Sequence, residues 1–325
     1  MSYEVLKPSL ESVKHSGRVA VLMGGTSAER DISLMSGNAV YEALINIGVD
    51  AFKLDIQDNA IDQLQQLKAD RVFNILHGRG GEDGQLQAVM DLLGITYTGS
   101  GVCASALAMN KLLTKRVLVG SGLPTPEFQV LNSEKDCKRL LEELGLPVFV
   151  KPNLEGSSIG MTAVTKAEGL IPAWEKAKQF GDVFAEKWVV GTEYTAGFLG
   201  DQVLPLIKLE TPREFYDYEA KYFSNDTIYT CPCGLDEETT TIINELVTKT
   251  IEVTGAKHWG RVDIMLDEEG QPFIIEINTV PGMTDHSLVP MAAKQAGLSM
   301  SELGLKIIEL TLKGDELSSV GGGDA

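Results

Sequence analysis

The chain has 325 residues, 43% of them hydrophobic and 23% charged, a balance that allows sizeable buried cores and indicates a globular protein of two or three structural units. Its formal net charge of −18 argues against nucleic acid as the main partner, because a phosphate backbone needs a basic face. The sequence also lacks the apolar run of a signal peptide or of a membrane span, so we expect a cytoplasmic protein.

The first elements along the chain predict an α/β domain. Residues 18–23 form an apolar run typical of a buried strand, and the double-glycine turn after it leads into a helix. Residues 72–76 predict a second buried strand, which is followed by the glycine-rich loop HGRGGEDG and by helical spacing over residues 85–93. The first domain is therefore expected to end near residue 110.

The rest of the chain predicts helices mixed with antiparallel strands. A helix over residues 111–119 is followed by two prolines, which separate it from the next strand. Strands are predicted over residues 128–131, 146–150, 184–189 and within 193–209, and helices over 168–178, 237–254 and 300–312. The final glycine-rich residues are expected to be disordered.

The segment 261–278, RVDIMLDEEGQPFIIEIN, predicts a hairpin whose turn fixes the register of its two strands. Because side chains alternate across a strand, one face should carry the apolar residues. These are Val262, Ile264 and Leu266 on the first strand and Phe273, Ile275 and Ile277 on the second. Pairing the two sets places Leu266 opposite Phe273, and the same register places Asp263 opposite Glu276.

Two carboxylates that face each other across strands repel, so the hairpin needs a cation to offset them. The same register places Arg261 opposite Asn278. The oxygen ligands of Asp263, Glu276 and Asn278 suit a hard ion such as Mg²⁺ or Mn²⁺. The alternative interpretation, a solvated polar face balanced by Arg261, is the better one for an isolated hairpin.

A nucleotide site of the P-loop kind is excluded, because the chain has no G-x-x-x-x-G-K-[ST] sequence. A different phosphate cradle is available at residues 155–161, EGSSIGM, whose glycines and free backbone N–H groups could close over a triphosphate. Lys151, at the end of an apolar strand, and Lys111 could neutralise phosphate charge. Glu186 and Glu193 could accept hydrogen bonds from an adenine amine and ribose hydroxyls. Each of these signals alone also fits an ordinary surface loop or surface charge.

Taken together, the motifs of this chain resemble the ATP-grasp superfamily and, within it, the bacterial D-alanine:D-alanine ligase family. The resemblance covers roughly residues 18–312. It rests on the segments GGTSAER, LHGRGGEDG, YTGSG, KPNLEGSSIGM, EKW, FYDYEAKY, WGRVDIML and EINTVPGMTDHS.

The resemblance implies an N-terminal Rossmann-like pre-ATP-grasp domain followed by a two-subdomain ATP-grasp fold, a mixture of α/β and α+β architecture. The expected divisions are a polar leader at 1–17, the N-terminal α/β substrate domain at 18–110, a central ATP-grasp subdomain at 111–200, a C-terminal catalytic subdomain at 201–312 and a disordered tail at 313–325.

The resemblance also implies which residues bind ATP and metal. The implied ATP contacts are Lys111, Lys151, Glu186, Glu193 and Lys221, with backbone groups of Lys187 and Val189 framing the adenine. The implied ligands of two magnesium or manganese ions are Asp263, Glu276 and Asn278, which agrees with the hairpin argument above.

The implied reaction begins with attack of a D-alanine carboxylate on the γ-phosphate of ATP, which gives an acyl phosphate. The amine of a second D-alanine then attacks the acyl phosphate, and Arg261 with the N–H of Gly282 would stabilise the oxyanion. The implied substrate residues are Glu29 for the first ammonium, Ser157 and Tyr222 as hydroxyls linked to Glu29, His77 near the second substrate and Ser287 for its carboxylate.

Three other functions are compatible with parts of the pattern. A relative that uses D-lactate or D-serine as second substrate would share the fold, although the phenol of Tyr222 favours dipeptide formation in the family. A non-catalytic nucleotide-binding regulator would not need both metal carboxylates. A dehydrogenase is disfavoured because GGTSAER lacks the G-x-G-x-x-G spacing. We expect a homodimer.

Overall fold

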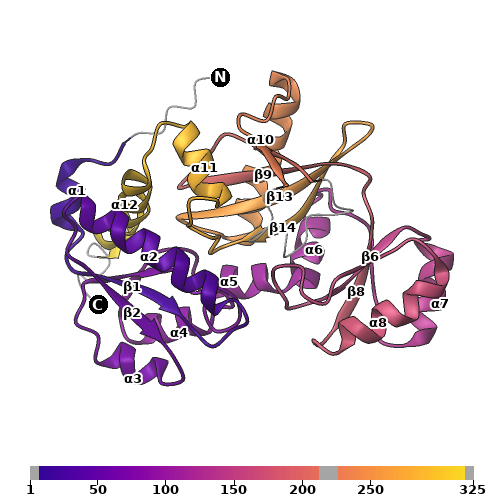
Figure 1. Ribbon diagram of the computed structural model, residues 1–325, viewed down its shortest axis with the longest axis horizontal. Helices are drawn as coiled ribbons and strands as arrows, with labels where there is room; N and C mark the ends of the chain where they lie inside the picture. The colour runs from indigo at the N-terminus through magenta and orange to yellow at the C-terminus, as the bar shows by residue number, and fades with distance from the viewer. Residues whose placement is uncertain (1–6, 212–225, 319–325) are drawn as a thin grey trace, which may run out of the picture.

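The computed structural model describes residues 7–211 and 226–318, and the chain within those ranges forms three β-sheets (Figure 1). The mixture of parallel and antiparallel sheets agrees with the predicted α/β and α+β fold class. Within the described ranges, no helix has the length and apolarity needed to cross a bilayer.

The first sheet is parallel and has the strand order β2-β1-β3-β4. Its elements are β1 (Val19–Gly24), β2 (Ala51–Ile56), β3 (Arg71–Asn74), β4 (Thr96–Tyr97), α2 (Arg30–Asn46), α3 (Ala60–Gln65) and α4 (Gln85–Leu92). Alternate residues of β1 enter two different cores: Val21 packs in the core that contains residues of α2, and Leu22 packs in the core that contains residues of α4. A strand buried on both faces is continuously apolar, which explains why its sequence was recognisable.

The second sheet is antiparallel, with the order β5-β8-β6-β7, and belongs to the central part of the chain. Its elements are β5 (Phe128–Val130), β6 (Val148–Pro152), β7 (Thr162–Val164), β8 (Val183–Lys187), α7 (Glu134–Glu143), a 3-10 turn (Ala167–Gly169) and α8 (Leu170–Lys178). Val148 and Val150 pack with α7 and α8, so the side chains between them, such as Phe149, point to the opposite face. That face of the sheet is turned toward the site described below.

The helices α5 (Val102–Met109) and α6 (Lys111–Gly120) lie between the N-terminal sheet and the central sheet (Figure 1). Helix α6 starts at an N-cap, because the Asn110 side chain accepts a hydrogen bond from the N–H of Leu113 at 3.0 Å. The Asn153 side chain, beyond β6, accepts a hydrogen bond from the N–H of Leu112 at 2.9 Å. The start of α6 is thereby fixed to the central sheet.

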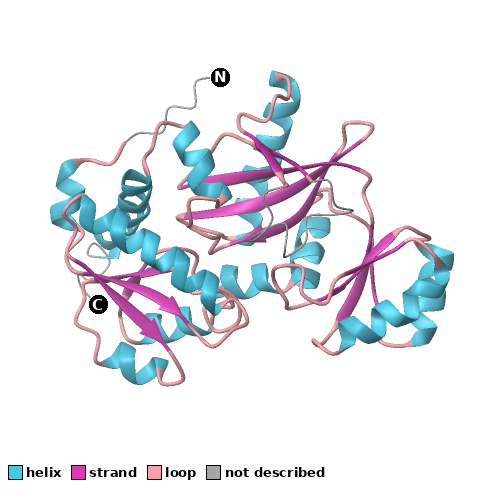
Figure 2. Cartoon of the chain, viewed as in Figure 1, coloured by secondary structure: helices cyan, strands magenta, loops and turns pink. Residues whose placement is uncertain are grey.

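The third sheet has the order β12-β11-β9-β13-β14, with β10 paired to β9. Its elements are β9 (Gly191–Leu199), β10 (Gln202–Val203), β11 (Ile207–Glu210), β12 (Ile228–Thr230), β13 (Trp259–Asp267), β14 (Pro272–Asn278), α10 (Glu237–Thr254), α11 (Leu288–Gln295) and α12 (Met300–Ser318). Residues of α10 and residues of α11 pack with residues of this sheet in two different hydrophobic cores (helices and strands are shown in Figure 2).

The N-terminal and C-terminal parts of the chain share one hydrophobic core. Val21 of β1 and Leu44 of α2 belong to the same buried cluster as Trp259 of β13, Val289 of α11 and Ile308 of α12. The residues before β1 join this arrangement, because α1 (Leu10–His15) lies against α12 and the Ser12 hydroxyl donates to Glu309 at 2.6 Å.

A second connection between these parts is made at the residue before β13. His258 has a positive φ of 63° and is mostly buried, and its Nδ1 accepts a hydrogen bond from the N–H of Gly99 at 3.1 Å. The N–H of Lys257 donates to the Ser100 hydroxyl at 3.0 Å. Burial lowers the pKa of His258 to about 4, and the charge of Lys257 acts in the same direction. The imidazole is therefore neutral at physiological pH, as its acceptor role requires.

Several local expectations differ from the structure. The leader contains α1, and α12 continues to Ser318 instead of ending at residue 312. The elements β2, α3 and α7 had not been predicted. The segment FYDYEAKY, with Lys221 and Tyr222, and the last residues 319–325 lie outside the described ranges.

Candidate active site

Two adjoining pockets lie between the units of the fold. The first is lined by residues of the N-terminal and C-terminal units, including Glu29 and His77, and the second by residues of the central and C-terminal sheets. Lys111, Ser157 and Glu276 line both, so the pockets meet at these three side chains. A ligand in one pocket can therefore approach a ligand in the other.

The β13–β14 hairpin has the predicted register where the carboxylates lie. Asp263 pairs with Glu276, and Arg261 pairs with Asn278. The expected pairing of Leu266 with Phe273 is wrong, because the register shifts beyond Asp263 and Leu266 pairs with Pro272 instead.

The cause of this shift is a β-bulge, which inserts one extra residue into the second strand. Ile274 and Ile277 both enter the hydrophobic core, and the extra residue, Ile275, lines the second pocket beside Glu276. The prediction that Ile275 shares the core face with Ile277 is therefore wrong.

Each hairpin carboxylate is offset by a basic side chain. Arg261 donates from Nη2 to Asp263 Oδ2 and from Nε to Oδ1, both at 2.8 Å, and the Thr195 hydroxyl donates to Oδ1 at 2.6 Å. Lys111 Nζ lies 3.0 Å from Glu276 Oε2. Arg261 therefore neutralises the charge of Asp263, as the alternative interpretation expected. The charge of Glu276 is neutralised instead by a lysine from another element.

The donor set fits a hard divalent cation. Asp263 and Glu276 line the second pocket, and Asn278 lines the first, where its Oδ1 accepts a hydrogen bond from the N–H of Val280 at 3.0 Å. Oxygen ligands from two carboxylates and an amide are those that Mg²⁺ accepts, with the remaining positions filled by water or phosphate. Over the described ranges, no three His, Cys, Asp or Glu side chains converge into a metal cage, so a cation here would need such additional oxygens.

Glu29 and Ser157 meet across the boundary between the N-terminal and central units. Glu29 is the N-cap residue of α2 and is mostly buried, and its Oε1 accepts a hydrogen bond from the Ser157 hydroxyl. Gly78 lies so close that a Cβ atom would be 2.9 Å from Glu29 Oε2, and its φ of 73° also favours glycine. The predicted link between Glu29 and Ser157 is therefore present, and its third member, Tyr222, lies outside the described residues.

The loop that carries Ser157 is held by further contacts. Ser157 and Ser158 have positive φ values of 51° and 61°, a conformation that is costly for residues other than glycine. Glu155 of this loop forms an ion pair with Arg79 of the HGRGGEDG loop at 2.9 Å. Contacts from the N-terminal unit thus stabilise the EGSSIGM loop over the place where the pockets meet.

His77 lies on the floor of the first pocket and is buried. Its Nε2 is 3.3 Å from the Ser36 hydroxyl, which accepts a hydrogen bond from the N–H of Met283 at 3.1 Å. Burial lowers the pKa of His77 to about 4, and the charge of Arg261 adds to the effect. His77 is therefore a neutral imidazole.

Gly282 and Ser287 form another part of the first pocket. Ser287 is the N-cap residue of α11, and its Oγ accepts a hydrogen bond from the N–H of Thr284 at 2.9 Å. A Cβ atom on Gly282 would lie 2.9 Å from this oxygen. The glycine therefore keeps the backbone close to Ser287 and the helix N-terminus, a combination that favours anions.

The second pocket combines charged residues with an apolar wall. Lys151, Glu186, Lys187, Val189 and Glu193 all line it, as predicted for a nucleotide site. The wall includes Phe149 and Trp188, whose ring centroids are 4.8 Å apart, together with Ile159, Met161, Met265 and Ile275. The N–H of Lys187 already donates to the Glu127 carbonyl at 2.8 Å, so it is not available to a base. A base could instead donate a hydrogen bond to the carbonyl of Lys187.

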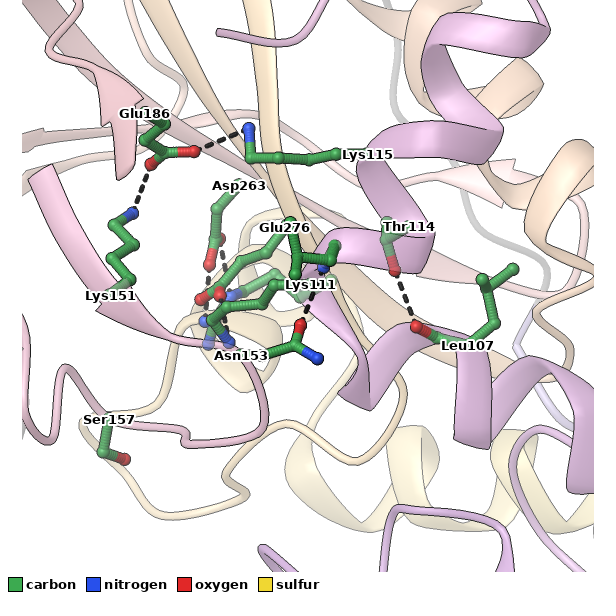
Figure 3. A network of polar contacts seen from close by, with 12 residues as sticks. Leu107, Lys111, Thr114, Lys115, Lys151, Asn153, Ser157, Glu186, Asp263 and Glu276 are labelled. Carbon is green, nitrogen blue, oxygen red and sulfur yellow. Dashed lines mark hydrogen bonds and ion pairs between the residues drawn. The ribbon is translucent and has the colours of Figure 1, made fainter. Parts of the chain in front are cut away.

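Glu186 is held between two lysines (Figure 3). Lys151 pairs with Oε1, and Lys115 lies 2.6 Å from Oε2. Burial opposes the charge of Glu186, but the two ammonium groups outweigh it and hold the pKa of Glu186 below its usual value.

Lys115 and Glu82 are among the charged residues at or beside the pockets that were not predicted. Lys115 could have been inferred from its position one turn after Lys111 on the same helix. Glu82, in the HGRGGEDG loop, lines the first pocket, and its Oε1 accepts a hydrogen bond from the N–H of Gly78 at 2.8 Å. Burial raises the pKa of Glu82 to about 8, and the nearby Glu29 acts in the same direction.

Comparisons with known proteins agree on one family. Residues 53–100 match the family model described as D-ala D-ala ligase N-terminus, and residues 117–309 match the model described as D-ala D-ala ligase C-terminus. The D-alanine–D-alanine ligase of Methylococcus capsulatus is 52% identical over 305 residues, which span 94% of this chain and 99% of the relative. That of Ectopseudomonas mendocina is 53% identical over 296 residues, 91% of this chain and 95% of the relative.

Solved structures give the same result. The D-alanine–D-alanine ligase from Bacillus anthracis complexed with ATP has a TM-score of 0.81 at 32% identity and covers 93% of this chain and 98% of its own. The VanG D-Ala:D-Ser ligase from Enterococcus faecalis has a TM-score of 0.80 at 29% identity and covers 90% of this chain and 99% of its own.

Proposed function

The chain belongs to the D-alanine–D-alanine ligase family, and we propose that it joins two D-alanine molecules into a dipeptide for peptidoglycan synthesis, with ATP as the source of energy. One observation supports this most directly: a pocket lined by both acidic and basic side chains adjoins a second pocket that has an apolar wall and is lined by three lysines. The pockets meet at Lys111, Ser157 and Glu276, so an amino acid in one could react with a phosphate in the other.

In the nucleotide pocket, we assign the adenine amine to Glu186 and the carbonyl of Lys187, with a backbone group of Val189 also framing the base, and the ribose to Glu193. Lys111 and Lys151 would neutralise phosphate charge, with Lys221 as a further contact by its place in the motif. Such neutralisation lowers the barrier to phosphoryl transfer because negative charge moves during the step.

In the amino-acid pocket, Glu29 would bind the ammonium of the first D-alanine, with Ser157 and Tyr222 closing that end. The carboxylate of this substrate would attack the γ-phosphate and release ADP. The second D-alanine would bind near His77, with its carboxylate at Ser287, and its amine would attack the acyl phosphate. Arg261 and the N–H of Gly282 would stabilise the oxyanion before phosphate leaves.

Asp263, Glu276 and Asn278 are the residues that would hold magnesium or manganese, with two ions expected. When bound, the metal supplies positive charge to the phosphate oxygens. Arg261 and Lys111 pair with these two carboxylates in the structure, so both basic side chains would change partners on binding of metal and nucleotide.

A coupled assay of ADP release, with the product identified by mass spectrometry, tests this function. We expect ADP release to require D-alanine and a divalent cation and to yield the dipeptide. The similarity to a D-Ala:D-Ser ligase makes D-serine the natural competitor, and D-lactate the next. Exclusive incorporation of either would refute the choice of second substrate, and ATP binding without turnover would indicate a regulator.

Two further expectations remain proposals. We propose that the enzyme acts in the cytoplasm, where ATP is available, and that it forms a homodimer. Light scattering at several protein concentrations measures the mass directly, and a monomer at all of them would refute the dimer.

A further inference from the structure

Lys115 is a buried charged residue that has no part in the reaction described above. It lies on α6, one turn after Lys111, so both side chains project from the same face of the helix. The residue is only 1% exposed and does not line either pocket. Burial of an ammonium group is costly unless it is paired, so this position needs a specific partner.

The ammonium of Lys115 is saturated by acceptors of the protein. Its Nζ lies 2.6 Å from Glu186 Oε2 and donates to the Thr125 hydroxyl at 2.8 Å and to the Pro126 carbonyl at 3.4 Å. Since a lysine ammonium has three N–H groups, these acceptors use all of them. Lys115 therefore acts through Glu186 instead of contacting a ligand.

The carboxylate of Glu186 lies between the ammonium groups of Lys115 and Lys151, and the three side chains form one charged group (Figure 3). Glu186 and Lys151 face the nucleotide pocket, and Lys115 lies behind its wall. With its carboxylate ionised, the group carries two positive charges and one negative charge, a net charge of +1. A buried group with excess positive charge is suited to an anionic ligand.

We propose that Lys115 is a positioning residue for ATP, which neutralises and orients Glu186 so that the charge of Lys151 is available to the nucleotide phosphates. This inference rests on the proposed function. Without Lys115, Glu186 and Lys151 would form a neutral pair, and the carboxylate would hold Lys151 away from phosphate. The carboxylate would also lose the partner that fixes its orientation toward the base.

The test is steady-state kinetics of Lys115→Met, which keeps the apolar length of the side chain and removes its charge. We expect the KM for ATP to rise about tenfold or more, as for loss of one partner of a buried charge pair, while the KM for D-alanine stays within about twofold. Lys115→Arg restores the positive charge and should recover most of the ATP affinity. The matched control is Lys306→Met, which removes a part-buried lysine from a pair with Glu309 on α12, far from the pockets.

A milder variant keeps the test valid if Lys115→Met does not fold. Thr125→Val removes the hydroxyl that orients the Lys115 ammonium and leaves every charge in place. We expect it to raise the KM for ATP about two- to threefold, with weaker quenching of Trp188 fluorescence by ADP. A KM for ATP that stays at the wild-type value in every folded variant, with only the thermal midpoint lowered, would overturn the proposal. Failure of the proposed function would appear separately, as wild-type protein that releases no ADP with D-alanine.

Discussion

Glu276 is the residue whose replacement best separates catalysis from folding. The substitution Glu276→Gln keeps the size of the side chain and an oxygen that can accept a hydrogen bond from Lys111, but it removes the charge. In the structure the carboxylate lies 3.0 Å from Lys111 Nζ and opposite Asp263 on the neighbouring strand. One attraction and one repulsion therefore disappear together.

The two electrostatic changes largely cancel in the free energy of unfolding. At an effective dielectric constant of about 20, the attraction to Lys111 is about 5 kcal/mol, and repulsion by a carboxylate about 5 Å away, as for cross-strand neighbours, is about 3 kcal/mol. Because the new amide still accepts a hydrogen bond, we expect the unfolding free energy to change by no more than about 2 kcal/mol. The kcat should fall by about a thousandfold or more, since the negative charge needed to hold a divalent cation is lost.

Two measurements on the same preparation test this expectation: ADP release dependent on D-alanine at saturating magnesium, and thermal unfolding. Glu252→Gln is the matched control, because Glu252 pairs with Lys249 at 2.8 Å on the exposed face of α10. A kcat within about tenfold of the wild type would refute the assignment of Glu276. A large loss of stability would instead show that Lys111 depends on this carboxylate for folding.

Burial lowers the pKa of His258 to about 4, compared with 6.5 in the unfolded chain. The neutral imidazole therefore contributes its full stabilisation above pH 6.5, and the free energy of unfolding falls by up to about 3 kcal/mol as the pH falls toward 4. The variant His258→Asn tolerates a positive φ and keeps an acceptor for the N–H of Gly99. Its free energy of unfolding, measured by guanidinium titration, should depend less on pH than that of the wild type, and an equal pH dependence would contradict this. Reversing the charge of either Arg79 or Glu155 should raise the KM for ATP about two- to fivefold, a modest change because Arg79 is half exposed. The double reversal should restore the KM, and failure to do so would show that the ion pair does not hold the loop. Chelation of divalent cations should abolish ADP release but leave the thermal midpoint nearly unchanged, because basic side chains already offset both hairpin carboxylates. A large drop in the thermal midpoint would show that the fold needs the metal.

The hairpin shows both the reach and the limit of sequence patterns. Alternation along the strands and the position of the turn were sufficient to place Asp263 opposite Glu276. The bulge at Ile275 could not be read from the same pattern, because Ile274 and Ile275 are both apolar and the choice between them depends on what packs against each.

Features that depend on distant segments were also missed. His258 adopts a conformation typical of glycine, and the neighbouring sequence gives no local signal for it. Its conformation is accompanied by a hydrogen bond from Gly99 and by burial between two units that are far apart in sequence. Lys115 is different, since its spacing from Lys111 indicates a shared helix face and could have drawn attention to it, but its partner Glu186 comes from a strand of another unit.

The core shared by the two ends of the chain constrains the order of events during synthesis. Val21 and Leu44 leave the ribosome long before Ile308, which belongs to the same cluster. The part of this core that faces α11 and α12 therefore stays uncovered in the N-terminal unit until those helices have been made. Chaperone binding to nascent chains, followed as a function of their length, would report when α12 finally covers it.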